Sequence, residues 1–322
     1  MKDQNKMETS VTYCSADGHT TVFGYFYTVP EGREPKAIVQ ISHGMQEYIQ
    51  RYRSLAYYLA EQGYIVCGND HLGHGQTSGD SGNDGWFAER CGDRYVLEDL
   101  HRMTAIAKVQ YPGLPCYLFG HSMGSFFARW YASVYPEELD GLIISGTSGP
   151  NPMSGMGLAL VKLLRRIKGG KYRSPFVEKL MFGGYCKDIP DAATGKEWVM
   201  RDPDGLAAYI TDPKCTFAFT LDAYRDLITV LQRVNQPEWS ESISKNLPIL
   251  LLSGDADPVG DYGNGVTAVR DMLVQAGVKD VTMHLYPGCR HEVHNDLQEY
   301  RELFYNELLS WLNQHVKGGM AV

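Results

Sequence analysis

The chain has 322 residues, of which 43% are hydrophobic and 21% are charged, proportions that exclude collagen and a largely disordered protein. Its 30 basic and 38 acidic residues give a net charge of −8, which argues against nucleic acid as a partner because phosphate binding needs a basic surface. The length is close to the limit of a single hydrophobic core, so we expect one large domain with an insertion, or two domains.

Short apolar strands alternate with helices along most of the chain. In chain order, we predict a hairpin completed by 20–27, a strand at 37–42, a helix at 55–62 and a strand at 64–67. A helix at 94–110, a strand at 116–119, a helix at 125–135 and a strand at 142–145 follow. After a long interval, the pattern continues with a strand at 249–253, a helix at 265–275, a strand at 281–286 and a helix at 299–315. This alternation predicts an α/β fold whose mostly parallel sheet is covered by helices on both faces. Because ligands of such sheets bind at the carboxyl ends of the strands, we expect functional residues directly after them.

The interval at 150–240 differs in composition, with paired glycines, several prolines and short helical segments. We interpret it as a cap inserted above the sheet, which divides the chain into core (1–149), cap (150–240) and core (241–322). The alternative is a plain structural excursion.

The chain shows no sign of export or of a membrane span. Its polar first ten residues lack the apolar stretch of a signal peptide, and no apolar run approaches the roughly 18 to 20 residues that cross a bilayer. The seven cysteines are scattered, with no Cys-x-x-Cys pair. We therefore expect free thiols and a cytoplasmic location rather than a disulfide framework or a zinc cluster.

A nucleophile motif follows the predicted strand 116–119. Gly120-His121-Ser122-Met123-Gly124 fits Gly-x-Ser-x-Gly between a strand and a helix, the context in which a serine is held on a sharp turn. The five-residue pattern alone is weak evidence for a nucleophilic serine, and its position between a strand and a helix gives most of the support. The turn requires glycine at 120 and 124, exposes the Ser122 hydroxyl, and leaves the N–H of Met123 free at a helix N-terminus.

A nucleophilic serine needs a base, and the base needs an orienting acid. Candidates for both follow the last two predicted strands. Asp257 is preferred over Asp255, which we expect to cap the turn directly after its strand. His291 is preferred over His294, which we place on the next turn or helix.

An oxyanion hole needs two preorganised backbone N–H groups. Met123 supplies one of them, directly after the serine. His43-Gly44-Met45 follows the strand 37–42 and nominates the N–H of Met45 as the second. The plain alternative for His43-Gly44 is an ordinary turn.

The sequence resembles α/β-hydrolases of the monoglyceride lipase and lysophospholipase-like group, the serine aminopeptidase S33-type hydrolases. The resembling stretches run through the core in the family's order: Ile41-Ser42-His43-Gly44-Met45, Asp70-His71-Leu72-Gly73-His74-Gly75-Gln76-Thr77-Ser78, Tyr111-Pro112-Gly113-Leu114-Pro115, Gly120-His121-Ser122-Met123-Gly124, Asp255-Ala256-Asp257-Pro258-Val259 and Gly288-Cys289-Arg290-His291-Glu292. The resemblance implies an α/β-hydrolase fold with an inserted helical cap.

The resemblance also assigns roles residue by residue. It makes Ser122 the nucleophile, Asp257 the orienting acid and His291 the base, with oxyanion donors at Met45 and Met123. It gives the loop 70–78 a supporting role. Ser125 departs from the family pattern, because many members carry a third glycine there.

Two other chemistries fit the sequence poorly. The segment 73–78 half mimics a dinucleotide fingerprint but lacks its last glycine. The pairs His71/His74 and His291/His294 lack the i, i+4 spacing and the Glu of a helical zinc site. We therefore expect no cofactor and no metal.

The predicted cap carries six basic residues and no acid between 151 and 177. Interspersed apolar residues make this segment either a basic amphipathic helix that docks at an anionic lipid surface or a solvated face over a packed stripe. For the substrate we nominate the side chains of His43, His121, Trp198 and Phe217, with Phe219, Met181, Phe182 and Met200 as further candidates for an acyl pocket; the alternative for the apolar ones is ordinary core packing.

Together these observations predict a serine carboxylic ester hydrolase that acts on a small lipid ester, either monoacylglycerol or lysophospholipid. Two alternatives stay open. The same triad serves an S33-type aminopeptidase, an amidase or a thioesterase, and acidic cap residues facing the serine would favour the aminopeptidase. A catalytically silent binding protein on a hydrolase fold is the more remote alternative.

Overall fold

A single eight-stranded sheet organises the computed structural model, which describes residues 7–79 and 82–316. Its strands are β1 (Glu8–Cys14), β2 (Thr21–Tyr27), β3 (Ala37–Ser42), β4 (Tyr64–Asn69), β5 (Cys116–His121), β6 (Gly141–Ser145), β7 (Ile249–Gly254) and β8 (Val281–Tyr286), in the spatial order β1-β2-β4-β3-β5-β6-β7-β8. The pairs β1–β2 and β2–β4 are antiparallel and all others are parallel. The predicted opening hairpin and mostly parallel sheet are confirmed.

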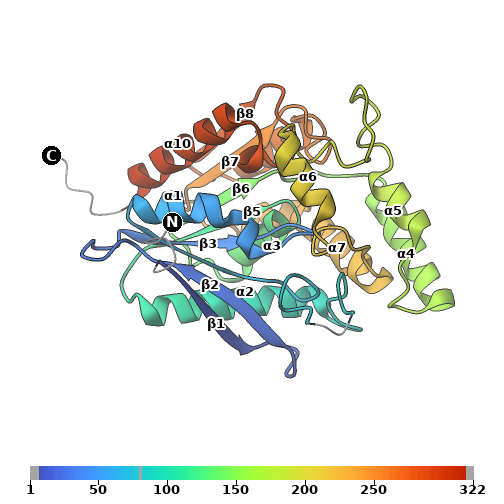
Figure 1. Ribbon diagram of the computed structural model, residues 1–322, viewed down its shortest axis with the longest axis horizontal. Helices are drawn as coiled ribbons and strands as arrows, with labels where there is room; N and C mark the ends of the chain where they lie inside the picture. Colours follow the sequence, from blue (N-terminus) through green and yellow to red (C-terminus); the bar gives the residue numbers. More distant parts are fainter. Residues whose placement is uncertain (1–6, 80–81, 317–322) are drawn as a thin grey trace.

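Helices cover both faces of this sheet (Figure 1). The helices are α1 (Arg53–Glu61), α2 (Gly92–Gln110), α3 (Met123–Val134), α4 (Ser154–Lys168), α5 (Pro175–Phe182), α6 (Pro203–Thr211), α7 (Leu221–Val234), α8 (Pro237–Ser242), α9 (Asn264–Gln275) and α10 (Gln298–His315). One apolar core joins the sheet to α2, α3, α7 and α9, and a second core joins it to α1 and α10.

Alternation along each strand divides its side chains between the two cores. Ile38 packs toward α2 and α3 whereas Val39 packs toward α1, and Leu118 and Phe119 divide in the same way. Successive strand residues point to opposite faces, so a strand covered on both sides must be apolar throughout. This is why the strands appear in the sequence as short continuous apolar runs.

The boundary difference that matters for the site lies at the serine motif. We predicted a strand that ends at residue 119 and a helix that begins at 125, whereas β5 runs to His121 and α3 begins at Met123. The connection is therefore only Ser122. A turn this short fixes the side chain between two rigid elements.

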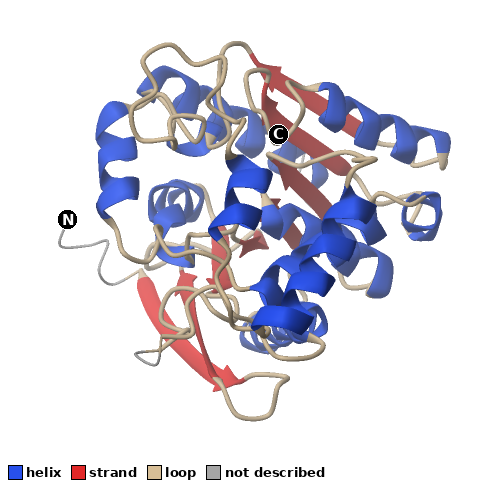
Figure 2. Ribbon diagram, turned by 90° about the vertical axis from the view of Figure 1, so that its right-hand side faces the viewer, coloured by secondary structure: helices blue, strands red, loops and turns tan. Residues whose placement is uncertain are grey.

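The segment between β6 and β7 extends beyond the carboxyl ends of the strands. Its helices α4 and α5 form one edge of the molecule in Figure 1, and from the cap side, helices and long loops lie in front of the sheet (Figure 2). Helix α7 is different, because it packs against the core helices α2 and α3 as well as against α4. The division at 149 and 240 stays a prediction, and we use "cap" below for 150–220.

All seven cysteines are free thiols, and Cys67, Cys116, Cys215 and Cys289 are buried. Across 7–79 and 82–316, no helix combines the length and apolarity that crossing a membrane requires. Residues 1–6, which carry part of the polar start, lie outside the described residues.

Candidate active site

Ser122 occupies a strained turn between β5 and α3. Its backbone has φ 53° and ψ −123°, a region that residues other than glycine rarely adopt. The flanking glycines have no room for a side chain. A Cβ at Gly120 would lie 2.5 Å from the Gly124 carbonyl oxygen, and a Cβ at Gly124 would lie 2.0 Å from that of Ser42. The close packing of β3, β5 and α3 thus forces the elbow predicted from the sequence.

A buried histidine–aspartate pair lies at the ends of the last two strands. His291 Nδ1 is 2.8 Å from Asp257 Oδ2, and both side chains are almost completely buried. Burial disfavours the imidazolium form, but the charge and hydrogen bond of Asp257 outweigh this effect and raise the pKa of His291 above its ordinary value. The carboxylate also fixes which ring nitrogen carries the proton, leaving Nε2 as the free base.

Asp255 and His294, the less preferred candidates for the acid and the base, make other contacts. Asp255 accepts a hydrogen bond from the N–H of Gly288 at 2.6 Å, and so holds the loop after β8 against the end of β7. His294 lies on a 3-10 turn, Val293–Asn295, stacked on the Tyr52 ring at 4.8 Å.

Two backbone segments meet beside the Ser122 side chain. A Cβ at Gly44 would lie 3.0 Å from the Ser122 Cβ, so the loop after β3 passes directly against the serine. Within the described residues, no protein acceptor pairs with the N–H of Met45 or of Met123. Met123 is also the first residue of α3, where backbone N–H groups are free and the helix dipole favours an anion.

One cavity of about 620 Å³ joins these groups, a volume within the usual range for small-molecule sites. Met45, His121, Ser122, Met123 and His291 lie along its core side. Ser122 and His291 share the cavity, and no hydrogen bond between them occurs among the described residues. The rest of the wall is mostly apolar: Phe126, Met153, Met156, Leu160, Leu180, Met181, Phe182, Tyr185, Trp198, Val199, Tyr209, Leu227, Ile228, Leu231 and Val259.

The nominated substrate contacts divide into two groups. Trp198 and His121 line the cavity, and their rings lie 5.2 Å and 4.7 Å from the ring of His291. The structure places His43 and Phe217 outside its wall, and their role toward the substrate stays a prediction. His43 is fully buried, with Nδ1 at 2.8 Å from the Gly44 carbonyl oxygen and Nε2 accepting the N–H of His71.

Phe217 lies one layer further from the serine. Its ring packs against His74 and Phe219, and its carbonyl accepts a hydrogen bond from the Gln46 side chain. Of the other acyl-pocket candidates, Met181 and Phe182 line the cavity, whereas Phe219 and Met200 are buried away from it.

The loop 70–78 braces the site from behind. The Asp70 carboxylate accepts the N–H groups of Ile49 at 2.9 Å and of Gln76 at 2.7 Å. These bonds join the loop after β4 to the loop after β3, which carries Met45. Its position agrees with the supporting role that the resemblance implied.

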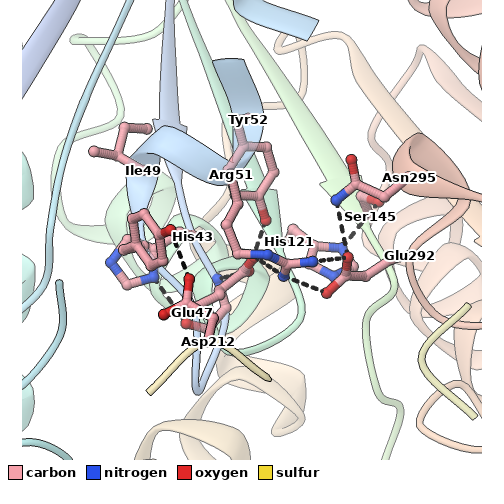
Figure 3. Close-up of polar contacts among 12 residues, drawn as sticks. His43, Glu47, Ile49, Arg51, Tyr52, His121, Ser145, Asp212, Glu292 and Asn295 are labelled. Atoms are coloured by element: carbon pink, nitrogen blue, oxygen red, sulfur yellow. Dashed lines mark hydrogen bonds and ion pairs between the residues drawn. The ribbon is translucent and has the colours of Figure 1, made fainter. Parts of the chain in front are cut away.

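A charged cluster at one end of the cavity was missed in the sequence. Arg51 lies between two carboxylates, with Nη1 and Nη2 each 2.7 Å from Glu292 and Nη1 3.1 Å from Glu47 (Figure 3). The Tyr52 hydroxyl donates a hydrogen bond to Glu47 at 2.7 Å. The N–H of Gly44 donates a second hydrogen bond to Glu47. Glu47 therefore holds the loop that carries Met45, and both carboxylates line the cavity.

The two carboxylates of this cluster differ electrostatically. Burial, together with the nearby charge of Glu292, raises the pKa of Glu47. Burial acts in the same direction on Glu292, but its two-point contact with Arg51 outweighs this and lowers its pKa. The i, i+4 spacing of Glu47 and Arg51 was visible in the sequence; their partner Glu292 was not, because it lies 241 residues from Arg51.

No group of three or more His, Cys, Asp or Glu side chains suited to a metal ion occurs in 7–79 and 82–316.

An eight-stranded, mostly parallel sheet with a serine on a strand–helix elbow defines the α/β-hydrolase class.

Comparison with known proteins identifies the family. The family model described as serine aminopeptidase, S33 matches residues 33–298. The monoacylglycerol lipase of Mycolicibacterium smegmatis is 27% identical over 284 residues, 88% of this chain and 90% of that protein. The human monoglyceride lipase is 27% identical over 299 residues, 89% and 86% of the two chains.

A solved structure is more similar still. The crystal structure of a thermostable carboxyl esterase from Bacillus coagulans in complex with glycerol has a TM-score of 0.89 and 35% identity, covering 96% of this chain and 99% of that one. The chain belongs to the serine aminopeptidase S33 family, in its monoglyceride lipase-like group, and is a serine ester hydrolase.

Proposed function

We propose that this enzyme hydrolyses esters of single-chain lipids, with monoacylglycerol as the preferred substrate, through Ser122, His291 and Asp257. The observation that carries the proposal is that Ser122, on its elbow, and His291, paired with Asp257 behind it, both lie in the wall of one largely apolar cavity.

The reaction follows from the positions of these groups. His291 takes the proton of Ser122 as the hydroxyl attacks the ester carbonyl, and Asp257 stabilises the resulting imidazolium. The N–H groups of Met45 and Met123 bind the oxyanion. His291 then protonates the leaving alcohol, and water releases the fatty acid from the acyl-enzyme in the same way.

The apolar wall favours one acyl chain as the group held beside the serine. It is formed by helices on both sides, with Leu160 and Met181 from the cap and Leu227 and Leu231 from α7. An unbranched chain buries its methylenes against such a wall, at about 0.8 kcal/mol for each CH₂.

The charged cluster favours an uncharged polyol as the alcohol. Glu47 and Glu292 line the cavity, whereas Arg51 lies behind them and outside its wall. Carboxyl oxygens accept hydrogen bonds from glycerol hydroxyls, and among the described residues no Lys or Arg lines the cavity to pair with a phosphate. We therefore expect the enzyme to prefer monoacylglycerol over lysophospholipid.

The aminopeptidase alternative loses support in the cap. Asp188, Asp191, Glu197 and Asp202 do not line the cavity. Glu197 instead accepts the N–H groups of Ala193 and Thr194, and Asp202 caps α6. An α-ammonium group would therefore lack the acidic partner that it needs from the cap.

We also propose that the enzyme works in the cytoplasm and contacts lipid surfaces through the outer face of the cap. Seven large apolar side chains of the cap are exposed: Met153, Met156 and Leu180, which also line the cavity, and Leu163, Ile167, Tyr172 and Phe176, which do not. A patch of this kind on a surface that also carries positive charge suits an anionic membrane. Of the basic residues, Lys162, Arg166 and Lys168 are exposed, whereas Arg165 pairs with Asp222.

The test is fatty-acid release from monooleoylglycerol and from oleoyl-lysophosphatidylcholine, which carry the same chain. We expect faster release from monooleoylglycerol, abolished by Ser122→Ala. Faster release from the lysophospholipid would overturn the head-group argument. Release from neither lipid, with a fluorophosphonate probe still labelling Ser122, would reject the lipid substrate and direct the search to amides and thioesters.

A further inference from the structure

A buried arginine on α3 has no acidic partner among the described residues. The Arg129 side chain is fully buried. Its guanidinium donates only to uncharged oxygens: Thr147 Oγ1 at 3.3 Å, the Ser148 carbonyl at 3.0 Å, Asn235 Oδ1 at 2.9 Å and the Val234 carbonyl. A buried cation without a counter-ion is costly, and burial lowers the pKa of Arg129 to about 9. An apolar side chain would avoid this cost, so we expect Arg129 to have a role other than packing.

The oxygens bonded by Arg129 belong to the two segments between which the cap is inserted. Residues 147–149 leave β6 toward the cap, and Val234 and Asn235 lie at the end of α7, the first helix after the cap. The Asn235 side chain also donates to the Gly149 carbonyl at 3.1 Å. Ser148 lines the cavity, as do three residues of α7. Arg129 therefore fixes the base of the cavity from below.

The same arginine is linked to the nucleophile through two hydroxyls. Ser125 Oγ lies 2.6 Å from the Ser122 carbonyl oxygen and 2.8 Å from Thr147 Oγ1. A guanidinium only donates and a carbonyl only accepts, so Thr147 donates to Ser125 and Ser125 donates to Ser122. The chain ends on the residue with the strained backbone, and strained conformations persist only where neighbouring contacts hold them.

We propose that Arg129 is a positioning residue that, through Thr147 and Ser125, holds the Ser122 elbow in register with the base of the cap. The inference rests on the proposed role of Ser122. It also accounts for Ser125 at a position where the family resemblance led us to expect glycine, since glycine has no hydroxyl to bond the Ser122 carbonyl.

The test is a double-mutant cycle between Ser125→Ala and Thr147→Val, measured with p-nitrophenyl butyrate, a soluble ester. Each change should lower kcat about fivefold, the equivalent of one ordinary hydrogen bond, with KM and the melting temperature nearly unchanged. Because both changes break the same chain, the second should add almost nothing to the first. Fluorophosphonate labelling of Ser122 should slow in parallel.

Ser133→Ala is the matched control. Ser133 lies on the same helix, and its hydroxyl donates to the Trp130 carbonyl at 2.7 Å, outside the chain of bonds. It should leave kcat unchanged and combine multiplicatively with Thr147→Val. Multiplicative losses for Ser125→Ala and Thr147→Val, or losses that follow the melting temperature alone, would overturn the inference.

Arg129→Lys extends the test to the arginine itself. One ammonium cannot serve four oxygens arranged around a planar guanidinium, so we expect a folded protein with reduced kcat and a raised KM for monooleoylglycerol; unchanged constants would count against the role of Arg129. Ser122→Ala separates the two proposals. If it retains turnover, both fail, whereas if it abolishes turnover and the cycle is multiplicative, only this inference fails.

Discussion

The core and the cap of this enzyme differ in the fraction of their residues that is buried. Every residue of β3, β4, β5, β6 and β7 is buried, whereas α4 of the cap buries only Val161 among its 15 residues. The proposed reacting groups all lie on the buried part, and the exposed apolar residues gather on the other. Close packing holds groups at fixed distances, so the core suits chemistry, and the cap suits contact with a variable lipid surface.

The two regions are also joined differently. The core is continuous apolar packing, but polar contacts contribute much of the attachment of the cap. Arg165 pairs with Asp222 at the start of α7, and Arg173 donates to the carbonyls of Gly82 and Asp84. Substitutions in the core should therefore affect every substrate, and substitutions in the cap should affect lipid substrates selectively.

The largest effect should come from the acid of the buried pair. Asp257→Asn leaves the imidazole without the partner that sets its tautomer, so turnover of a soluble ester should fall on the order of 10⁴-fold. Asp255→Asn, two residues away, should change turnover little, because its carboxylate only caps the N–H of Gly288. Equal losses in steady-state assays of the two variants would contradict the assignment.

Gly44→Ala should be the next most damaging change. The new Cβ would lie 2.5 Å from Glu47 Oε1 and 3.0 Å from the Ser122 Cβ, so the loop must shift and carry the N–H of Met45 with it. Loss of one oxyanion donor lowers kcat about 10²- to 10³-fold. Gly184→Ala in the cap, where a Cβ meets nothing within 4 Å, is the control. Full activity of Gly44→Ala would remove Met45 from the site.

Each charge removed from the outer face of the cap should have a smaller and selective effect. Replacing Lys162, Arg166 and Lys168 by Gln should weaken activity on monooleoylglycerol in anionic vesicles about fivefold for each charge removed. Activity on zwitterionic vesicles and on soluble esters should persist. If activity on anionic vesicles is unchanged, these residues form a solvated surface only.

The pH dependence of activity should be the mildest effect, and it depends on residues of the core alone. His291 must be neutral to act as a base, and Asp257 raises its pKa above the ordinary 6.5. The value of kcat/KM for a soluble ester should therefore decrease on acidification, reaching half its plateau above pH 6.5. In the residual activity of Asp257→Asn that midpoint should move to lower pH, because burial is then opposed only by the weaker effects of Glu292 and Glu47 on the pKa of His291. A midpoint below pH 6.5 in the unaltered enzyme would show that burial outweighs the carboxylate.

What the sequence predicted well was decided locally. The elbow could be placed because Gly120 and Gly124 meet a packing requirement within five residues, and the strands because burial on both faces requires continuous apolar runs. The positions of His43 and Phe217 outside the cavity wall could not be predicted from the sequence, because a position near the serine along the chain, or an aromatic side chain, does not say which way the ring points.

Pairings across long separations were decided only by the tertiary structure. Nothing near Arg51 indicates that Glu292 is its partner, nothing near Arg165 indicates Asp222, and nothing near Arg129 indicates a site made of uncharged oxygens from two distant segments. The sequence by itself determined the fold class and the serine elbow, because periodicity and steric limits act over a few residues. The shape of the cavity and the partners of buried charges depend on how distant segments pack together, which only the folded chain decides.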